Sequence, residues 1–395
     1  GVSAAGSFVM AVPVAALSGA QRLDVVNALN LFTLLGRSIV SVVAVALGTG
    51  LIGMSLAQAA TSAAGAVFAL VAAKRVAPAL LLRPRLVGFR EVVRLLPLSA
   101  RLTVMAISVQ VIFYTDNVII GVVLGVAAVA PYAVGFQVFD LAMKLTWRPV
   151  DVLLPFYAKA HASGSRAAVA AALLASTRVS LCLALAVTLP LVVFAEDLLA
   201  LWIGGDNVAP WPVLMGFAAL VILHAPVHSA AILVSAVTNA RWMFWCSIAE
   251  SVLNVALSLA LAHAIGLVGV ILGTLLAQTL VSLWAMPFYA CRVTGVGARQ
   301  YLRDAFGRPA IALVLLAAPL AAIARLASHD HVPTVLLGSA AMGLLAVVVF
   351  ARFGLTADDR AIARAALQTM VPRRRRGGAE LAVPGVSAVD GSGTT

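Results

Sequence analysis

Long apolar runs separated by short polar segments dominate the chain. The run from Leu102 to Leu124 is long enough to cross a bilayer, because about 20 helical residues at about 1.5 Å each match the hydrocarbon thickness. The pattern therefore predicts an all-α integral membrane protein with about 11 transmembrane helices. They cover residues 2–17, 28–47, 51–73, 102–124, 127–156, 179–195, 213–234, 242–264, 267–290, 310–327 and 335–350.

Composition supports the same class. Hydrophobic residues make up 63% of the chain, charged residues only 11%, and the mean hydropathy is +1.06. The net charge of +12 could suggest nucleic acid, but the basic residues lie in short loops between apolar runs, so we expect no nucleic-acid partner. Three distant cysteines (Cys182, Cys246 and Cys291) show no metal-ligand spacing, which predicts neither a disulfide framework nor a metal centre.

The distribution of charge predicts the sidedness of the loops. Residues 74–101 carry seven basic residues against one acid and should be cytoplasmic, whereas residues 195–211 carry only acids and should lie outside. The end of the chain, residues 352–395, is basic and then rich in Gly, Ser and Thr. We expect a disordered cytoplasmic tail there, with affinity for anionic membrane lipids.

An internal repeat relates two parts of the chain. Arg22 precedes a span that ends at GLIGMSLAQ, which starts at Gly50, and Arg241 precedes a span that ends at GLVGVILGT, which starts at Gly266. Both copies begin on the cytoplasmic side, so they are parallel repeats of the kind found in transporters built from two similar halves. Eleven spans with a cytoplasmic carboxyl end place Gly1 outside, and the missing Met indicates a fragment.

Two consecutive predicted spans, residues 102–124 and 127–156, carry most of the charged residues that would lie inside the membrane. Asp116 lies in one of them, and Asp140, Lys144, Arg148 and Asp151 follow in the next at spacings of four, four and three, which places these four on one helix face. A charge at the bilayer centre costs about 2.5 to 3.5 kcal/mol, so this face should line a polar path and avoid lipid.

Five segments carry a resemblance to a known family. They are YTDNVIIGVVLG from Tyr114, APYAVGFQVFD from Ala130, VLLPFYAKAHASG from Val152, LLALWIGG from Leu198 and SAVTNARW from Ser235. Together they resemble the bacterial polysaccharide flippases of the multidrug, oligosaccharidyl-lipid and polysaccharide exporter superfamily. The resemblance covers nearly the whole chain up to about Phe350 and consists of positional preferences, with no catalytic signature.

The resemblance implies a two-lobe architecture with an incomplete first lobe. Members of the family have twelve or fourteen helices. Eleven predicted spans match fourteen helices without the first three, so we expect the three amino-terminal helices to be missing from this sequence. On that mapping residues 1–73 are the last three helices of the first lobe and residues 74–101 a basic cytoplasmic linker. Residues 102–290 form the second six-helix lobe, residues 310–351 two additional helices, and residues 352–395 the tail.

The function that the resemblance implies is transport, without catalysis and without a bound cofactor. Its cargo is an undecaprenyl-pyrophosphate-linked oligosaccharide, moved across the bacterial cytoplasmic membrane by alternating access, with coupling to H+ or Na+. The family also implies a partnership with polysaccharide polymerase machinery. A cation-coupled multidrug exporter of the same superfamily is the nearest alternative, and a membrane-embedded transferase of glycan synthesis is a second.

Three cations are candidates for binding the pyrophosphate, because fixed positive charge in a wet cavity would offset the cost of desolvating the anion. Arg37 lies near the middle of its span, while Lys144 and Arg148 lie nearer the cytoplasmic mouth. The alternative is structural, since Lys144 and Arg148 could pair with Asp140 and Asp151 or extend to the interface. Neither reading is preferred on the sequence alone.

Three carboxylates are candidates for coupling transport to a cation gradient: Asp116, Asp140 and Glu250. The structural alternative, a neutral or ion-paired helix contact, carries equal weight. His224 and His228 share a helix face around Pro226, but without a third ligand they are interpreted as a hydrogen-bonded structural pair.

Overall fold

The computed structural model describes residues 11–15, 17, 22–76, 88–237, 241–326 and 332–360. Within these residues every regular element is a helix, and nine helical segments are long and apolar enough to cross a membrane. Such a chain satisfies its backbone hydrogen bonds inside each segment, as a bilayer demands. The prediction of an all-α, multi-pass membrane protein is confirmed, although most of the first predicted span, residues 2–17, lies outside the described residues.

The chain divides into two compact units, residues Gly1–Leu96 and Pro97–Thr395. In the first unit, α2 (Leu23–Ala46) and α3 (Gly50–Val76) form a hairpin and pack along their length. A Cβ atom at Gly36 would lie 2.7 Å from Cγ2 of Thr61, so glycine is needed for this close approach.

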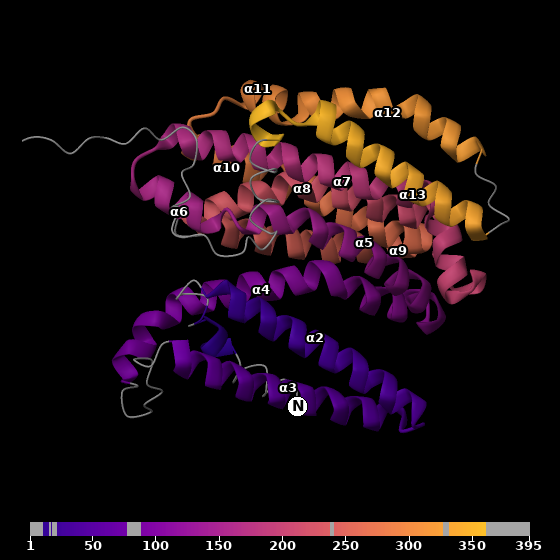
Figure 1. Cartoon of the computed structure of the whole chain (residues 1–395), viewed down its shortest axis with the longest axis horizontal. Helices are drawn as coiled ribbons and strands as arrows, with labels where there is room; N and C mark the ends of the chain where they lie inside the picture. Colours follow the sequence, from indigo (N-terminus) through magenta and orange to yellow (C-terminus); the bar gives the residue numbers. More distant parts are fainter. Residues whose placement is uncertain are drawn as a thin grey trace, which may run out of the picture. The chain divides into compact units, whose positions relative to one another are not determined.

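The second unit holds the remaining helices, which Figure 1 shows along the chain. They are α4 (Phe89–Val123, which crosses the unit boundary at Pro97), α5 (Val129–Asp151), α6 (Leu154–Ala162), α7 (Arg166–Ile203), α8 (Trp211–Val237), α9 (Arg241–Leu280), α10 (Ser282–Thr294), α11 (Ala298–Tyr301), α12 (Gly307–Leu326) and α13 (Val332–Val349). Short 3-10 turns at Val126–Ala128 and Gly205–Asn207 and π-helical turns at Leu302–Phe306 and Phe350–Gly354 complete it.

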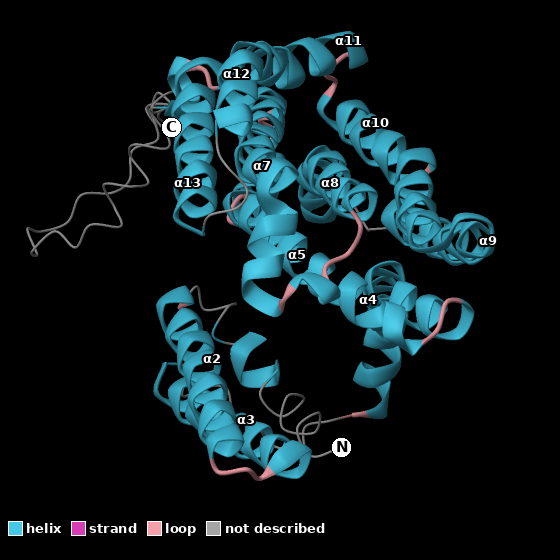
Figure 2. Ribbon diagram, turned by 90° about the vertical axis from the view of Figure 1, so that its right-hand side faces the viewer, coloured by secondary structure: helices cyan, strands magenta, loops and turns pink. Residues whose placement is uncertain are grey.

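Helix α8 is the centre of the second unit. It is apolar on all sides and packs against α5, α7, α9 and α10, as Figure 2 shows from the end of the bundle. Phe217 of α8 contacts the rings of Tyr132, Phe136 and Phe139 on α5, with ring centroids 5.0 to 5.7 Å apart. This aromatic cluster fixes α5 against α8.

Helix α9 reverses direction in its middle. Ile265 and Gly266 leave the helical conformation, and the two arms on either side pack back on each other. Added Cβ atoms at Gly269 and Gly273 would lie 2.0 Å from the carbonyl oxygen of Leu261 and 2.4 Å from the backbone nitrogen of Ser258. The 54-residue apolar segment Arg241–Thr294 therefore contains two arms that fold back on each other, and the break falls between the predicted spans 242–264 and 267–290.

The two copies of the sequence repeat share a backbone feature. Gly50 opens α3 with φ +60°, and Gly266 opens the second arm of α9 with φ +66°. Both values lie in the left-handed region, which favours glycine because it has no Cβ. Each copy is therefore a helical hairpin that turns at the glycine beginning its GL(I/V)G motif.

Two predicted boundaries differ from the structure. The linker predicted for residues 74–101 overlaps α4, which begins at Phe89, because Arg90, Arg94 and Arg101 are good helix formers. The disordered tail predicted for residues 352–395 is wrong for its first part. Residues 352–360 are ordered, and the rest lies outside the described residues.

Candidate functional site

A buried polar cluster surrounds Asp116 inside the second unit. Asp116 lies on α4 and is 4% exposed. Its Oδ2 atom accepts hydrogen bonds from the hydroxyl of Tyr132 on α5, at 2.8 Å, and from Oγ1 of Thr274 on the second arm of α9, at 2.9 Å. Three helix segments thus converge on one carboxyl group, in a setting where an unsatisfied charge would be costly.

The reversal of α9 supplies the other polar groups of this cluster. Nδ2 of Asn254, on the first arm, donates to Oγ1 of Thr274 at 2.8 Å, and the hydroxyl of Ser258 donates to the carbonyl oxygen of Val270 at 3.1 Å. Asn254 and Ser258 are four residues apart, as are Val270 and Thr274, so each pair shares a helix face. The small residues Gly269 and Gly273 let the two faces meet.

The cluster has more acceptors than donors. Within the described part of the chain, Oδ1 of Asp116 and Oδ1 of Asn254 are buried without a hydrogen-bond donor. Oxygen atoms are the ligands that hard cations prefer, and a carboxylate oxygen can also accept a proton. The surrounding space is too narrow for a water molecule in this conformation. The arrangement suits a small monovalent cation, H+ or Na+.

The charged face of α5 is only partly buried by its own unit. Lys144 forms an ion pair with Asp140 one turn away, and the Lys144 side chain is 51% exposed. Arg148 is exposed and has no ion-pair partner among the residues that the structure describes. Asp151 pairs instead with Nε2 of His228, at 2.8 Å. The four charged residues are therefore present along α5 as predicted. Lys144 makes the ion pair expected in the structural alternative, whereas Arg148 makes no ion pair among the described residues.

The remaining candidates lie apart from this cluster. Glu250, on the first arm of α9, is buried and accepts a hydrogen bond from the hydroxyl of Ser282 on α10. Arg37 lies on α2 in the first unit, about 21 Å of helix from its start at Leu23 and about 14 Å from its end at Ala46. Its side chain is exposed within that unit. The role of each of these residues stays a prediction.

Comparison with known proteins gives one match. A family model described as polysaccharide biosynthesis protein covers residues 5–207, about half of the chain. The chain belongs to this polysaccharide biosynthesis protein family. No curated protein and no solved structure matches it. The matched part of this polysaccharide biosynthesis protein includes Arg37, Asp116, Lys144 and Arg148.

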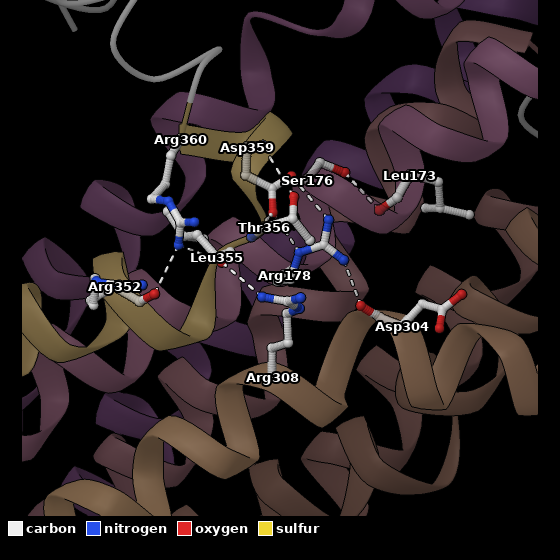
Figure 3. A network of polar contacts seen from close by, with 10 residues as sticks. All are labelled: Leu173, Ser176, Arg178, Asp304, Arg308, Arg352, Leu355, Thr356, Asp359 and Arg360. Atoms are coloured by element: carbon white, nitrogen blue, oxygen red, sulfur yellow. Dashed lines mark hydrogen bonds and ion pairs between the residues drawn. The ribbon is translucent and has the colours of Figure 1, made fainter.

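A buried ion pair on α7 was not predicted from the sequence. Arg178 on α7 donates to both carboxylate oxygens of Asp359, at 2.6 and 2.9 Å, and also to the carbonyl oxygen of Asp304, as Figure 3 shows. The side chains of Arg178 and Asp359 are 9% and 2% exposed. The pair joins α7 to the segment that follows α13.

The segment after α13 is ordered by local capping as well. The backbone N–H of Thr356 donates to Asp359 and the backbone N–H of Asp359 donates to the Thr356 hydroxyl, which is a reciprocal helix cap. Arg308 and Arg360 both donate to the carbonyl oxygen of Leu355. These contacts explain why residues 355–360 are ordered although the composition of the tail predicts disorder.

The pair affects the ionisation of Asp359, which lies beyond the last membrane span. Burial alone would raise the pKa of this carboxyl group, but the hydrogen bonds from Arg178 and Thr356 outweigh it. The pKa therefore lies below its usual value.

Sequence reasoning found Asp116 but not most of its partners. Tyr132, Ser258 and Thr274 are hydroxyl residues in apolar spans, and such residues are common in membrane helices. A signal was present in the glycines of GLVGVILGT, whose spacing of four allows another helix to approach closely. Polar residues one turn apart on the preceding span would then mark the facing surface.

Proposed function

We propose that this protein is a flippase, which moves an undecaprenyl-pyrophosphate-linked oligosaccharide from the inner to the outer leaflet of the bacterial cytoplasmic membrane. The family relates the chain to polysaccharide biosynthesis, and its helices suit a multi-pass transporter. Alternating access would move the glycan across the hydrocarbon core of the membrane without exposing it to lipid. No catalytic step is needed, because the cargo leaves chemically unchanged.

The observation that carries this proposal is the charged face of α5. Arg148 and Lys144 are exposed on a membrane-spanning helix that also buries Phe136, Phe139 and Met143 in its unit. A membrane helix that presents cations outside its packing surface needs an aqueous or anionic environment there. A pyrophosphate group supplies that anion, and guanidinium groups bind it with paired hydrogen bonds.

Charge distribution supports the orientation. Lys159 near the end of α6 and Arg166 at the start of α7 flank a turn that would lie in the cytoplasm, whereas Glu196, Asp197 and Asp206 around the end of α7 would lie outside. Arg148 is then near the cytoplasmic end of α5, where a lipid-linked headgroup first arrives. The carboxyl end of the chain is cytoplasmic in this orientation.

Coupling to an ion gradient would occur at Asp116. One oxygen of its carboxyl group is held by two hydroxyl donors and the other is without a donor, so loading and release of H+ or Na+ would change the charge of the lobe interior. A change of buried charge biases one conformation over the other. That bias provides the directional drive for alternating access.

Removing the guanidinium of Arg37 tests the substrate role. In cells that depend on this gene, Arg37→Ala should reduce polymer export at least about tenfold at unchanged protein level, since a charged hydrogen bond contributes about 1.5 to 3 kcal/mol. Surface polymer and membrane protein are measured in parallel. Arg75→Ala, an exposed arginine at the end of α3, is the matched control and should export normally.

Unchanged export with Arg37→Ala would refute the role of Arg37. The lipid intermediate separates the two transport readings. Intermediate that accumulates on the inner leaflet when the gene is deleted supports a flippase. Normal lipid intermediates with new sensitivity to cationic drugs would identify an exporter of the same superfamily instead.

A further inference from the structure

A chain of polar side chains continues from the Asp116 cluster along α8. His224 and His228 lie one turn apart on this helix, on either side of Pro226. The ring of Trp147 on α5 stacks on His228, with centroids 4.8 Å apart and planes 14° apart, and lies 5.2 Å from the ring of His224. Trp147 thus holds both imidazoles in fixed positions on one face of α8.

The outer end of this series of polar side chains lies next to the Asp116 cluster. Nε2 of Gln278 donates to Nδ1 of His224 at 2.9 Å, and Gln278 follows Thr274 by one turn on α9. Thr274 in turn donates to Asp116. On the other side, Phe113 lies one turn before Asp116 on α4 and contacts the edge of the His224 ring, at 5.9 Å between centroids. Residues of α9 and α4 therefore connect Asp116 with His224.

The inner end of this series of polar side chains reaches the surface of the unit. Nε2 of His228 bonds to Oδ1 of Asp151 at 2.8 Å, and the side chain of Asp151 is 39% exposed. Asp151 is the last residue of α5, and the short helix α6, with Lys159 in its last turn, and Arg166 at the start of α7 follow it. In the proposed orientation Asp151 is thus at the cytoplasmic end. The series of polar side chains then extends from Asp116, nearer the outer side, through His224 to the cytoplasmic end.

Unpartnered polar atoms occur along this line. Oδ1 of Asp116, Oε1 of Gln278 and Nε1 of Trp147 are buried without a hydrogen-bond partner among the described residues. Pro226 lacks an N–H, so the carbonyl oxygen of Ile222 loses its usual helical donor. Buried polar atoms in such positions are commonly satisfied by water. Waters here would bridge the gap between the two imidazoles, whose centroids are 6.4 Å apart.

The chemistry of these polar side chains suits the transfer of a proton better than the binding of a metal ion. Imidazole accepts a proton on one nitrogen and releases one from the other, whereas hard cations are bound mainly by oxygen atoms. Among the elements packed against α8, α5 contributes Asp151, which bonds to His228, and α9 contributes the neutral Gln278, which bonds to His224. Helices α6, α7 and α10 add no charged side chain to the contacts that the structure describes for the two histidines.

We propose that Gln278, His224, His228 and Asp151 form the route by which the coupling proton passes between Asp116 and the cytoplasm. This proposal rests on the flippase function and on Asp116 as its coupling site. Because the space beside Asp116 is too narrow for water in the described conformation, its proton is released in the alternative conformation of the transport cycle, through water to a ring nitrogen of His224. His224 then releases one proton through water to His228. His228 passes a proton to Asp151 or to bulk water. Each transfer breaks one O–H or N–H bond and forms another, so one proton is moved.

The route predicts slow proton release when either imidazole is replaced. In vesicles containing the purified protein and a lumenal pH dye, His224→Gln and His228→Gln should each slow proton movement driven by lipid-linked oligosaccharide by about 100-fold, the lower range for loss of a proton-transfer group. Glutamine retains hydrogen bonding, and thermal unfolding in detergent checks that each variant is folded. His263→Gln is the matched control, because His263 is exposed on α9 and bonds only locally to Leu259.

Two results would overturn the route without touching the proposed function. In the first, both variants flip substrate and move protons at the wild-type rate while Asp116→Asn does neither. In the second, wild-type flipping requires Na+ and moves no protons. Wild-type protein that moves no lipid-linked oligosaccharide under any gradient would instead refute the function itself. Slow proton movement in both variants, with normal movement in His263→Gln, supports the route.

Discussion

Replacing Asp116 with Asn should abolish the dependence of transport on the ion gradient while leaving the fold intact. The amide has the shape of the carboxyl group, so its oxygen can still accept the hydrogen bonds from Tyr132 and Thr274. Its NH2 group takes the place of Oδ1, the oxygen that already lacks a hydrogen-bond partner among the described residues. The variant therefore loses the ability to load and release a cation without leaving new unsatisfied groups.

The expected result is a transport rate that no longer responds to an imposed gradient of H+ or Na+. At a gradient that drives the wild type, the variant should be slower by at least about tenfold, the effect of about 1.4 kcal/mol on a rate. The rate is measured in vesicles in which each gradient is imposed separately. The same experiment identifies the coupling ion.

Asp140→Asn is the informative control for this experiment. The Asp140 carboxylate is already neutralised by Lys144 one turn away, so its removal should leave the gradient dependence unchanged. Glu250→Gln tests the third carboxylate, which is buried with Ser282 away from the Asp116 cluster. Gradient dependence that survives in Asp116→Asn would refute the coupling role, and its loss in Asp140→Asn would move the site to α5.

Removing the carboxylate of Asp359 should strongly destabilise the second unit. Asp359→Ala leaves the Arg178 guanidinium buried without its counter-charge, and breaking one side of a buried ion pair costs about 3 to 5 kcal/mol. The free energy of unfolding is measured in detergent micelles by thermal or chemical denaturation. Asp358→Ala, on the exposed neighbour, should change it by less than about 0.5 kcal/mol.

A double substitution separates the pair from general damage. Arg178→Met combined with Asp359→Leu removes both charges, and a buried pair replaced by apolar groups is often neutral in stability. The double variant should therefore be more stable than Asp359→Ala. Equal stability of Asp359→Ala and the wild type would show that the pair does not fasten the segment after α13.

The pair also has a defined pH dependence. The pKa of Asp359 is lowered in the folded protein, so its stabilising contribution is complete above the unfolded pKa of about 3.9 and is lost as the pH falls through the lower folded value. At neutral pH the ion pair with Arg178 stabilises the segment after α13 in full. Acid below about pH 4 should release it, and the Asp359→Ala variant should lack this transition.

The sequence predicted features that depend on a single helix. The spans follow from apolar length, and the charged face of α5 follows from spacings of four and three. The hairpin repeat follows from the motif after Gly50 and after Gly266, where the structure finds positive φ angles. Each of these is local, because one helix or one turn determines it.

Features that depend on partners were not predictable in this way. The pairing of Arg178 with Asp359 joins residues 181 positions apart, and no periodicity connects them. The partners of Asp116 come from α5 and from the second arm of α9, and the close approach of the α9 arms brings Asn254 and Ser258 to them. His228 was interpreted as the partner of His224, yet its hydrogen bond is to Asp151 on another helix.

The account is tested most directly by measuring flipping with the purified protein. Vesicles are loaded with a fluorescent undecaprenyl-pyrophosphate-linked oligosaccharide, and a membrane-impermeant quencher reports which leaflet holds it. The account predicts that wild-type protein equilibrates or drives the lipid between leaflets, and that Arg37→Ala and Asp116→Asn do so far more slowly. A leaflet distribution identical to that of protein-free vesicles, under gradients of both H+ and Na+, would contradict it.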